Sequence, residues 1–440
     1  MGLFGSKTRS TQIMIDVGSS SVGGAYVCYE SGQLPIIYYS TRINMEPRPN
    51  ETHEDLMLRT LEEVTNRLVK KGAPEVRREV GNAHADGTLV SIAAPWQETR
   101  VRTETIQSVR PFVFTKKLLN DTVRKSANVQ EGWVDSGDSV IATILNGYEI
   151  PNPFGKSVKR AELVVLSSTL QKEVMESIER VMRKAFHSHD VTFTGFAPVW
   201  YRIFREMYQH ENDYLILDIR GARSDLAFIQ RGLLRDVGSI PHGTRALLSI
   251  GQAASDLIPT TVIPQGSGLG ASYLNRNRNV QFGARVQEAE EEWIECLATL
   301  LKEFAGRQAL PRTMFLLADD DVRGFLVRAL DTPAIHTMWL SDEPLRIVPI
   351  TPAQFTPYVR TFGTNVADIF IDLLALYHTK STPTVENEPE ILPPPVKLTK
   401  EQRKALKEQE KEAAKAARPT MGDMVSSAAV GVEGEPDFSM

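Results

Sequence analysis

The segment Tyr214–Gly243, YLILDIRGARSDLAFIQRGLLRDVGSIPHG, holds two short apolar runs joined by a turn. The first run, Tyr214–Leu217, has the length of a buried strand and is followed directly by Asp218. The turn is built on Gly221, and the second run, Leu226–Ile229, follows at the spacing of a β-hairpin. The segment therefore predicts a hairpin of buried strands with an acid where the first strand ends.

The same pattern occurs near the start of the chain. Ile13–Ile15 leads to Asp16, a turn of glycine and serine follows at Gly18–Ser21, and an apolar run returns through Ala25–Val27. Two strand–acid–glycine–strand hairpins about half a chain apart indicate an internal duplication. We therefore predict an α/β molecule of two related lobes, with both turns facing one cleft.

The composition is that of a globular chain with substantial cores, since 42% of its 440 residues are hydrophobic. A formal net charge of −5 provides no general attraction for nucleic acid, so we predict no nucleic-acid partner. The two cysteines, Cys28 and Cys296, lie in apolar runs without metal-ligand spacing. We interpret them as buried packing residues of a cytoplasmic protein.

The two ends of the chain differ from its body. No run approaches the roughly 20 apolar residues of a membrane span, and no signal-peptide core is present, so secretion is not expected. Met1–Ser6 fits an N-myristoylation pattern and is read either as a frayed terminus or as a weak membrane contact. Ser381–Val396 is proline-rich and predicts a stiff linker. Lys397–Arg418 is charged and is read as a solvated helix or disordered segment, or as a docking segment.

Changes in residue pattern divide the chain into five parts. The first lobe is predicted in two pieces, 1–98 and 169–212, on either side of an inserted strand–helix–strand–strand unit at 99–168. The second lobe is predicted at 213–380. A proline-rich linker and a charged, flexible tail, which we expect to be disordered, complete the chain at 381–440.

Apolar spacing places individual elements within these parts. The inserted unit is predicted to contain Val101–Val109, Lys116–Lys125, Val140–Leu145 and Ala161–Leu166. Amphipathic helices are predicted in the lobes at Asp55–Lys71, Gln171–Phe186, Arg285–Phe304 and Val366–Tyr377. The second lobe also has a predicted helix at Thr244–Leu257, a glycine-rich loop at Pro264–Gly270 and a strand at Thr313–Ala318.

The residue types in the two turns are suited to binding phosphate. A glycine turn lets backbone N–H groups approach a phosphate closely and small hydroxyls add donors, which Gly18, Ser19 and Ser20 provide. An acid at the end of the preceding strand can hold magnesium, usually through water, which suits Asp16 and Asp218. The alternative is that both hairpins are parts of a duplicated fold without a ligand. No nucleophile or acid–base constellation is evident.

Three segments resemble the FtsA/PilM branch of the actin-like ATPase superfamily. Residues 13–27, IMIDVGSSSVGGAYV, resemble its first phosphate motif, and residues 217–243, LDIRGARSDLAFIQRGLLRDVGSIPHG, resemble its second. Residues 142–185, ATILNGYEIPNPFGKSVKRAELVVLSSTLQKEVMESIERVMRKA, resemble the end of the FtsA-type inserted subdomain and the helix after it. In the order of its elements, the likeness runs from Ile13 to His378.

The resemblance implies a duplicated, ribonuclease-H-like fold with ATP and magnesium between its lobes. It also implies self-association into filaments or dimers. Residues at the positions that match the motifs would contact phosphate or metal. The acids that end the two strands would be the metal ligands. The matching residues are Asp16, Gly18, Ser19 and Ser20 in the first lobe, and Asp218, Gly221 and Asp225 in the second, with Asp16 and Asp218 as the metal ligands.

The chain departs from the family at three places. Arg220 stands where the family usually has glycine, and Arg223 stands where it has threonine. Ala318-Asp319 replaces a Gly-Gly turn near the adenosine. Losing a glycine removes close backbone approach to phosphate, whereas arginine can itself pair with phosphate. The C-terminal amphipathic anchor typical of FtsA is not visible in the sequence.

The resemblance implies an FtsA-like scaffold of bacterial cell division that works with the tubulin-like protein FtsZ. Such a scaffold would bind ATP weakly or only structurally and would be at most a slow ATPase. The alternative cellular role is pilus assembly, in which a PilM-like protein joins pilus assembly proteins at the inner-membrane platform of type IV pili. The alternative to a scaffold is an enzyme, either an active ATPase or a small-molecule kinase. Both scaffold roles imply peripheral association with the cytoplasmic face of the inner membrane.

Overall fold

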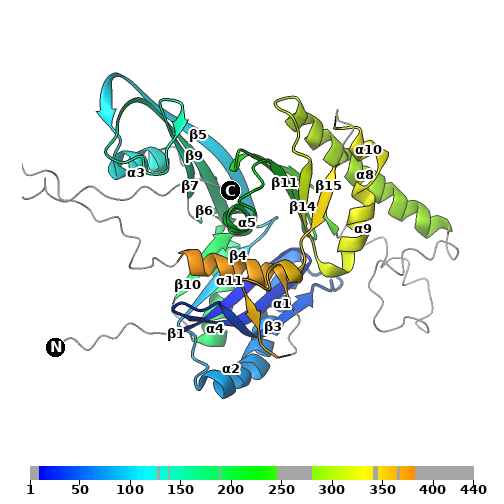
Figure 1. Cartoon of the computed structure of the whole chain (residues 1–440). Helices are drawn as coiled ribbons and strands as arrows, with labels where there is room; N and C mark the ends of the chain where they lie inside the picture. Colours follow the sequence, from blue (N-terminus) through cyan, green and yellow to red (C-terminus); the bar gives the residue numbers. More distant parts are fainter. Residues whose placement is uncertain are drawn as a thin grey trace, which may run out of the picture. The chain divides into compact units, whose positions relative to one another are not determined.

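The computed structural model describes residues 9–125, 129–136, 139–187, 190–244, 280–339, 345–363 and 367–381. Three β-sheets with helices packed on them make up this part of the chain (Figure 1). Several predicted segments lie outside the described residues. These are the N-terminal segment Met1–Ser6, all but the first residue of the helix Thr244–Leu257, the loop Pro264–Gly270, and the linker and tail from residue 382 onward.

The first sheet has the strand order β10-β4-β1-β2-β3-β16. Its strands are β1 (Arg9–Val17), β2 (Ser21–Glu30), β3 (Ile36–Asn44), β4 (Gly87–Ile92), β10 (Val191–Gly195) and β16 (Arg360–Thr361). β1 pairs antiparallel with β2 and parallel with β4. Ile13 and Ile15 pack in one core and Met14 in another, so β1 is apolar on both faces, as expected for a covered central strand.

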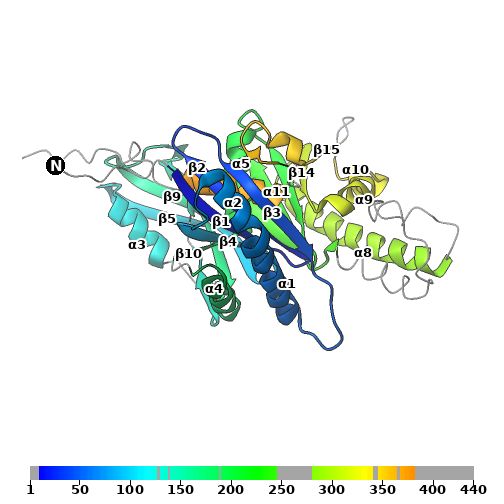
Figure 2. The same cartoon turned by 90° about the horizontal axis from the view of Figure 1, so that it is seen from below.

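Helices cover one face of this sheet (Figure 2). They are α1 (His53–Arg67), the π-helical turn η1 (Leu68–Gly72), α2 (Ala73–Val80) and α4 (Lys172–Phe186). α1 begins at Thr52, whose side chain accepts a hydrogen bond from the N–H of Asp55. Leu61 and Val64 from α1 and Ile178 from α4 share a core with the outer face of β1. The helices predicted at Asp55–Lys71 and Gln171–Phe186 are therefore present.

The second sheet has the order β13-β12-β11-β14-β15. Its strands are β11 (Tyr214–Ile219), β12 (Ser224–Gln230), β13 (Leu233–Ile240), β14 (Thr313–Leu317) and β15 (Arg346–Pro349). β11 pairs antiparallel with β12 and parallel with β14, and β14 pairs parallel with β15. These pairings repeat those of β3-β2-β1-β4-β10 strand for strand, which confirms the predicted duplication.

The helices of the second lobe pack on the outer face of its sheet (Figure 1). They are α8 (Val280–Ala305), α9 (Asp320–Leu330) and α10 (Pro333–His336). Leu217 and Phe228 from the sheet share a core with Trp293 and Leu297 from α8. α8 begins five residues before the start predicted at Arg285, as the structure extends it to Val280.

The two lobes share a core that lies between their sheets. Two helices, α5 (Phe196–Met207) and α11 (Ile369–Ser381), contribute to it. Met14 from the first sheet and Ile216 from the second belong to the same cluster as Trp200, Phe370 and Leu374 from these helices. The helices thus bring the inner faces of both sheets into one apolar core.

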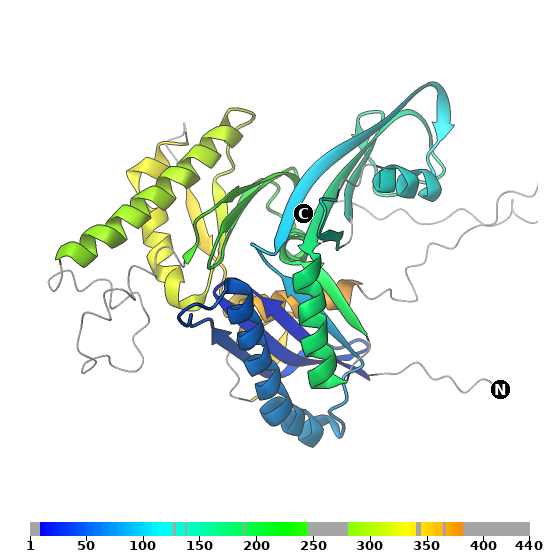
Figure 3. The same ribbon diagram turned by 180° about the vertical axis from the view of Figure 1, so that it is seen from behind.

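The inserted unit is a third sheet with the order β5-β9-β7-β8. Its elements are β5 (Gln97–Val113), α3 (Lys116–Lys125), β6 (Trp133–Asp135), β7 (Ser139–Leu145), β8 (Tyr148–Glu149) and β9 (Ser157–Gln171). The predicted strand–helix–strand–strand order is present, with the short strands β6 and β8 in addition. β9 runs directly into α4 (Figure 3). β5 begins at Gln97, before the predicted start at residue 99, and β9 ends at Gln171, after the predicted end at residue 168. That the inserted unit is a separate domain with the boundaries 99–168 stays a prediction.

Two further observations concern membrane-spanning helices and the cysteines. Among the helices that the structure describes, none is long and apolar enough to cross a membrane. Cys28 is buried as predicted, but Cys296 is only partly buried, and its Sγ lies 3.8 Å from Nδ1 of His242. Cys296 lies on α8 near the edge of the core, so an apolar run alone did not determine its burial.

Candidate functional site

The structure brings the two predicted turns into direct contact. The N–H of Ala222 in the β11–β12 turn donates a hydrogen bond of 2.8 Å to Oγ of Ser19 in the β1–β2 turn. A Cβ atom placed on Gly221 would lie 2.6 Å from the backbone nitrogen of Ser20, closer than real Cβ contacts. Glycine at this position therefore lets the two turns touch, rather than leaving a gap between them.

Asp16 lies at the centre of this contact and is fully buried. Its Oδ1 accepts a hydrogen bond of 2.9 Å from Oγ of Ser91. Its Oδ2 accepts from Nη2 of Arg42 at 2.9 Å and from Nη1 of Arg220 at 3.2 Å. Burial acts to raise the pKa of Asp16, but the two guanidinium groups outweigh it and hold the pKa below its usual value.

Arg220 connects the acids of the two lobes. Its side chain is 4% exposed, and its Nε donates to Oδ1 of Asp218 at 3.0 Å while Nη1 reaches Asp16. Its Cζ lies 4.2 Å from the ring centroid of Phe196 and 3.7 Å from that of Phe370. Aromatic faces favour a cation at these distances. A single buried guanidinium therefore pairs with both predicted metal ligands.

The second-lobe acids have partners of their own. Burial raises the pKa of Asp218 to about 7, although Arg220 acts in the opposite direction. Asp225, which pairs with Asp218 across the hairpin, lies 3.2 Å from Nε of Arg223 and also accepts a hydrogen bond from Ser239. Arg223 therefore neutralises a neighbouring acid on its own hairpin.

The remaining predicted residues are also bonded within the protein. The N–H of Gly18 donates to the carbonyl of Ser21 at 3.0 Å. Oγ of Ser20 donates to Oδ2 of Asp319 at 3.0 Å. Asp319 occupies the N-cap position of α9, but its side chain makes no capping hydrogen bond and instead accepts from Ser20.

Arg42 and Asp368 belong to the same cluster and were not predicted from the sequence. Nε of Arg42 lies 2.7 Å from Oδ2 of Asp368, and Nη1 donates to Oγ of Ser21 at 2.9 Å. Arg42 pairs with Gly23 across β2 and β3, and a Cβ atom on Gly23 would lie 2.5 Å from Nη2 of Arg42. The sequence signal that could have identified Arg42 is an arginine within an apolar run, since a buried strand seldom carries a charge without a partner.

This cluster does not fit a magnesium–ATP complex. Magnesium would need oxygens such as Oδ2 of Asp16 and Oδ1 of Asp218, which are paired with Arg220. Phosphate would need turn N–H groups such as those of Gly18 and Ala222, which already have acceptors. No group of three His, Cys, Asp or Glu side chains within the described ranges could hold a metal ion. That Asp16, Gly18, Ser19 and Ser20, with their second-lobe counterparts, bind phosphate or metal stays a prediction that this geometry does not support.

A hollow of about 550 Å³ lies beside the cluster. Arg42 and Arg323 line it, but so do Asp319, Asp320 and Asp368. Carboxylates repel a phosphate unless a cation lies between them. In this hollow, acids therefore offset the two arginines that could face a phosphate.

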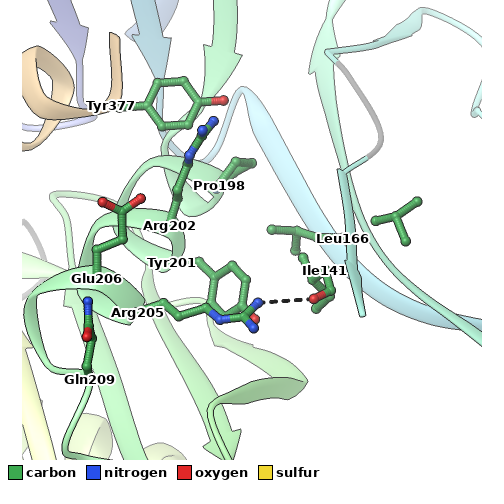
Figure 4. A pocket seen from close by; sticks show the side chains of 10 residues that line it. Ile141, Leu166, Pro198, Tyr201, Arg202, Arg205, Glu206, Gln209 and Tyr377 are labelled. Atoms are coloured by element: carbon green, nitrogen blue, oxygen red, sulfur yellow. Dashed lines mark hydrogen bonds between the residues drawn. The ribbon is translucent and has the colours of Figure 1, made fainter. Parts of the chain in front are cut away.

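A larger groove, of about 720 Å³, lies between the inserted unit and α5 (Figure 4). Leu166, Pro198 and Tyr201 line it and are buried, whereas Arg202, Arg205 and Gln209 line it and are exposed. Tyr377 from α11 contributes to one end, with Cζ of Arg202 lying 5.8 Å from its ring centroid. The groove thus combines an apolar floor with a polar rim.

One wall of the groove is the backbone of β7. The pairing of β7 with β9 shifts register between Val140 and Ala142, so Ile141 has no partner residue on β9. The carbonyl of Ile141 instead accepts a hydrogen bond of 3.1 Å from Nη1 of Arg205 (Figure 4). In the described part of the chain, β8 pairs with β7 at Ile144 and Leu145, and the N–H of Ile150 donates to the carbonyl of Thr143. The edge of β7 before Thr143 bears no described strand. An extended segment could lie along this edge.

Comparisons with known proteins identify the fold. No protein-family model matches the chain, and no curated protein matches it. The structure is similar to a solved "PilM-PilN type IV pilus biogenesis complex", with a TM-score of 0.54 and 15% sequence identity, over 84% of this chain and 99% of that chain. The protein therefore has a two-lobe, actin-like α/β fold.

Two other solved structures match with lower scores. One is a Bacteroides thetaiotaomicron protein with an actin-like ATPase fold and unknown function, with a TM-score of 0.39 and 10% identity over 86% of this chain and 99% of that one. The other is the ethanolamine utilization protein EutJ from Carboxydothermus hydrogenoformans, with a TM-score of 0.37 and 12% identity over 84% and 89%.

Proposed function

We propose that this chain is a PilM-like assembly scaffold that holds an extended segment of a partner protein in the groove between the inserted unit and α5. The groove is the observation that carries the proposal. Its buried floor of Leu166, Pro198 and Tyr201 can receive apolar side chains. Its rim of Arg202 and Arg205 supplies charged donors that fix the register of a bound chain.

The similarity to a PilM-PilN complex supports a partner from the type IV pilus machinery. A segment bound in extended form uses main-chain hydrogen bonds for affinity and side-chain pockets for specificity. The apolar floor offers the pockets, and the edge of β7 before Thr143 offers main-chain groups, of which the carbonyl of Ile141 is bonded to Arg205. The FtsA-type division role, filament formation and peripheral membrane association stay predictions. An active ATPase or kinase is disfavoured, because Asp16 and Asp218 are paired with Arg220.

Site-specific crosslinking tests the proposal in the native host. A photoreactive amino acid replaces Gln209 on the exposed rim of the groove, and a matched variant carries it at Lys184 on the exposed side of α4. We expect Gln209, but not Lys184, to crosslink to a pilus assembly protein identified by mass spectrometry. A groove-specific crosslink to a tubulin-like protein would instead support the division role, and identical products from both positions would refute the proposed groove.

Charge reversal on the rim gives a quantitative prediction. The double variant Arg202→Glu, Arg205→Glu should retain about tenfold less, or less still, of the partner that crosslinking identifies, when no crosslinker is present. Hydrogen bonds to charged groups contribute about 1.5–3 kcal/mol each. Co-purification of the two proteins measures this. Arg180→Glu, Lys184→Glu makes the same change of charge on exposed positions of α4 and should leave retention unchanged. Equal losses in both double variants would point to net charge rather than to the groove.

A further inference from the structure

Arg220 lies where acids from both lobes converge. Asp16 ends the first strand of one lobe, Asp218 ends the corresponding strand of the other, and both carboxylates are buried. Two buried carboxylates that face one point repel each other unless a positive charge lies between them. The Arg220 guanidinium donates to both, at 3.2 Å and 3.0 Å. This arrangement places a cation where one is required for the two lobes to close.

Contacts from several elements hold the side chain of Arg220, although its Nη2 is buried without a hydrogen-bond partner in the described structure. Its Nη1 would lie 3.4 Å from a Cβ atom on Gly18, so it passes close to the first-lobe turn. Phe196 from α5 and Phe370 from α11 contact the guanidinium. The guanidinium is always charged and its donors form a rigid fork, so it can bridge two acids in a fixed geometry.

The backbone of Arg220 is fixed as well. Its N–H donates to the carbonyl of Arg223 at 2.9 Å, and its carbonyl accepts from the N–H of Thr244 at 2.9 Å. A Cβ atom on Gly243 would lie 2.0 Å from that same carbonyl oxygen, so the chain passes closely over the turn. Contacts within the chain therefore fix the backbone from which the guanidinium extends.

We propose that Arg220 is an intramolecular substitute for a divalent cation, which bridges the acids of the two lobes and holds the lobes in one closed arrangement. A divalent ion would bind and dissociate as its concentration changes, whereas Arg220 is covalently part of the chain. The cleft therefore does not open and close with nucleotide. This inference does not depend on the partner in the groove, because none of the residues that line the groove pairs with Arg220.

Removing Arg220 should create a need for the ion that it replaces. Full-length wild type and Arg220→Gly are unfolded thermally with MgCl₂ or with NaCl at equal ionic strength. Wild type should respond equally to both salts. Arg220→Gly should unfold at a lower temperature and gain about 2 °C or more from MgCl₂ over NaCl. The variant Arg220→Gly, Asp218→Asn should lose that gain. A folded Arg220→Gly protein that responds equally to both salts would overturn the proposal.

Arg220→Lys decides the matter if Arg220→Gly does not fold. Lysine keeps the charge, but its ammonium is a point charge that cannot bridge both acids as the fork does. The turns should then separate more often, and hydrogen exchange of the Ala222 amide, which donates to Ser19, should be about tenfold faster than in wild type. Exchange at the wild-type rate would mean that bridging by Arg220 does not hold the turns together.

Discussion

Asp16→Ala should lower the free energy of unfolding by about 3–5 kcal/mol, the cost of removing one partner from a buried ion pair. Asp16 is fully buried, and it accepts hydrogen bonds from Arg42, Arg220 and Ser91. Without it, both arginines lose a carboxylate and remain in the interior. An acid that served only to hold a metal–nucleotide complex would have the opposite effect, because its removal would relieve repulsion in the free protein.

Chemical denaturation of wild type and Asp16→Ala measures this loss. Glu30→Ala is the matched control, because Glu30 also pairs with an arginine, Arg9, at 3.3 Å, but with both side chains more than two-fifths exposed. An exposed pair contributes about 0–1 kcal/mol, so this control should be nearly neutral. A loss for Asp16→Ala no larger than that of Glu30→Ala would contradict a structural role for Asp16.

Asp372→Asn should stabilise the protein, and the gain should increase with pH. Asp372 lies on α11, is 2% exposed, and its Oδ1 has no hydrogen-bond partner in the described structure. Burial, together with the negative charge of Asp368, raises the pKa of Asp372 to about 8. An unfolded aspartate has a pKa of about 3.9. At pH values between these two pKa values, Asp372 is protonated in the folded protein but ionised in the unfolded chain.

Stability therefore falls as pH rises through this window, by up to about 1.4 kcal/mol for each pH unit. Asparagine has a similar volume and no charge, so Asp372→Asn should match wild type near pH 4 and exceed it progressively toward pH 8. Unfolding measured across this range shows the difference, with Asp121→Asn on the exposed side of α3 as the control. A difference between Asp372→Asn and wild type that does not change with pH would show that Asp372 is not protonated in the folded state.

The strand and helix pattern could be predicted from the sequence because it is local. The continuous apolar runs of β1 and β11 and the helical spacing of apolar residues in α4 lie within these segments themselves, and the two acid–glycine turns repeat at corresponding places. β13 was missed because Arg235 and Asp236 interrupt its apolar residues. β15 was missed because it has only four residues and ends in Pro349. Both strands form through pairing with neighbours, so their own residues carry little of the signal.

The electrostatics of the site depends on contacts that no local pattern contains. Arg42 reaches Asp16 only because the register of β2 and β3 places it opposite Gly23. Asp368 joins the cluster from a segment 326 residues away from Arg42. The sequence therefore predicted that Asp16 and Asp218 would face one cleft. Their neutralisation by arginine becomes evident only in the folded chain.

Calorimetric titration of the wild-type protein with ATP and MgCl₂ tests most directly whether this actin-like chain acts as a scaffold with a closed cleft. Because Arg220 pairs with Asp16 and Asp218, and the two turns are in contact, we expect no saturable binding heat. Saturable binding of magnesium–ATP that is lost in Asp16→Asn would contradict the closed cleft and restore these acids as ligands.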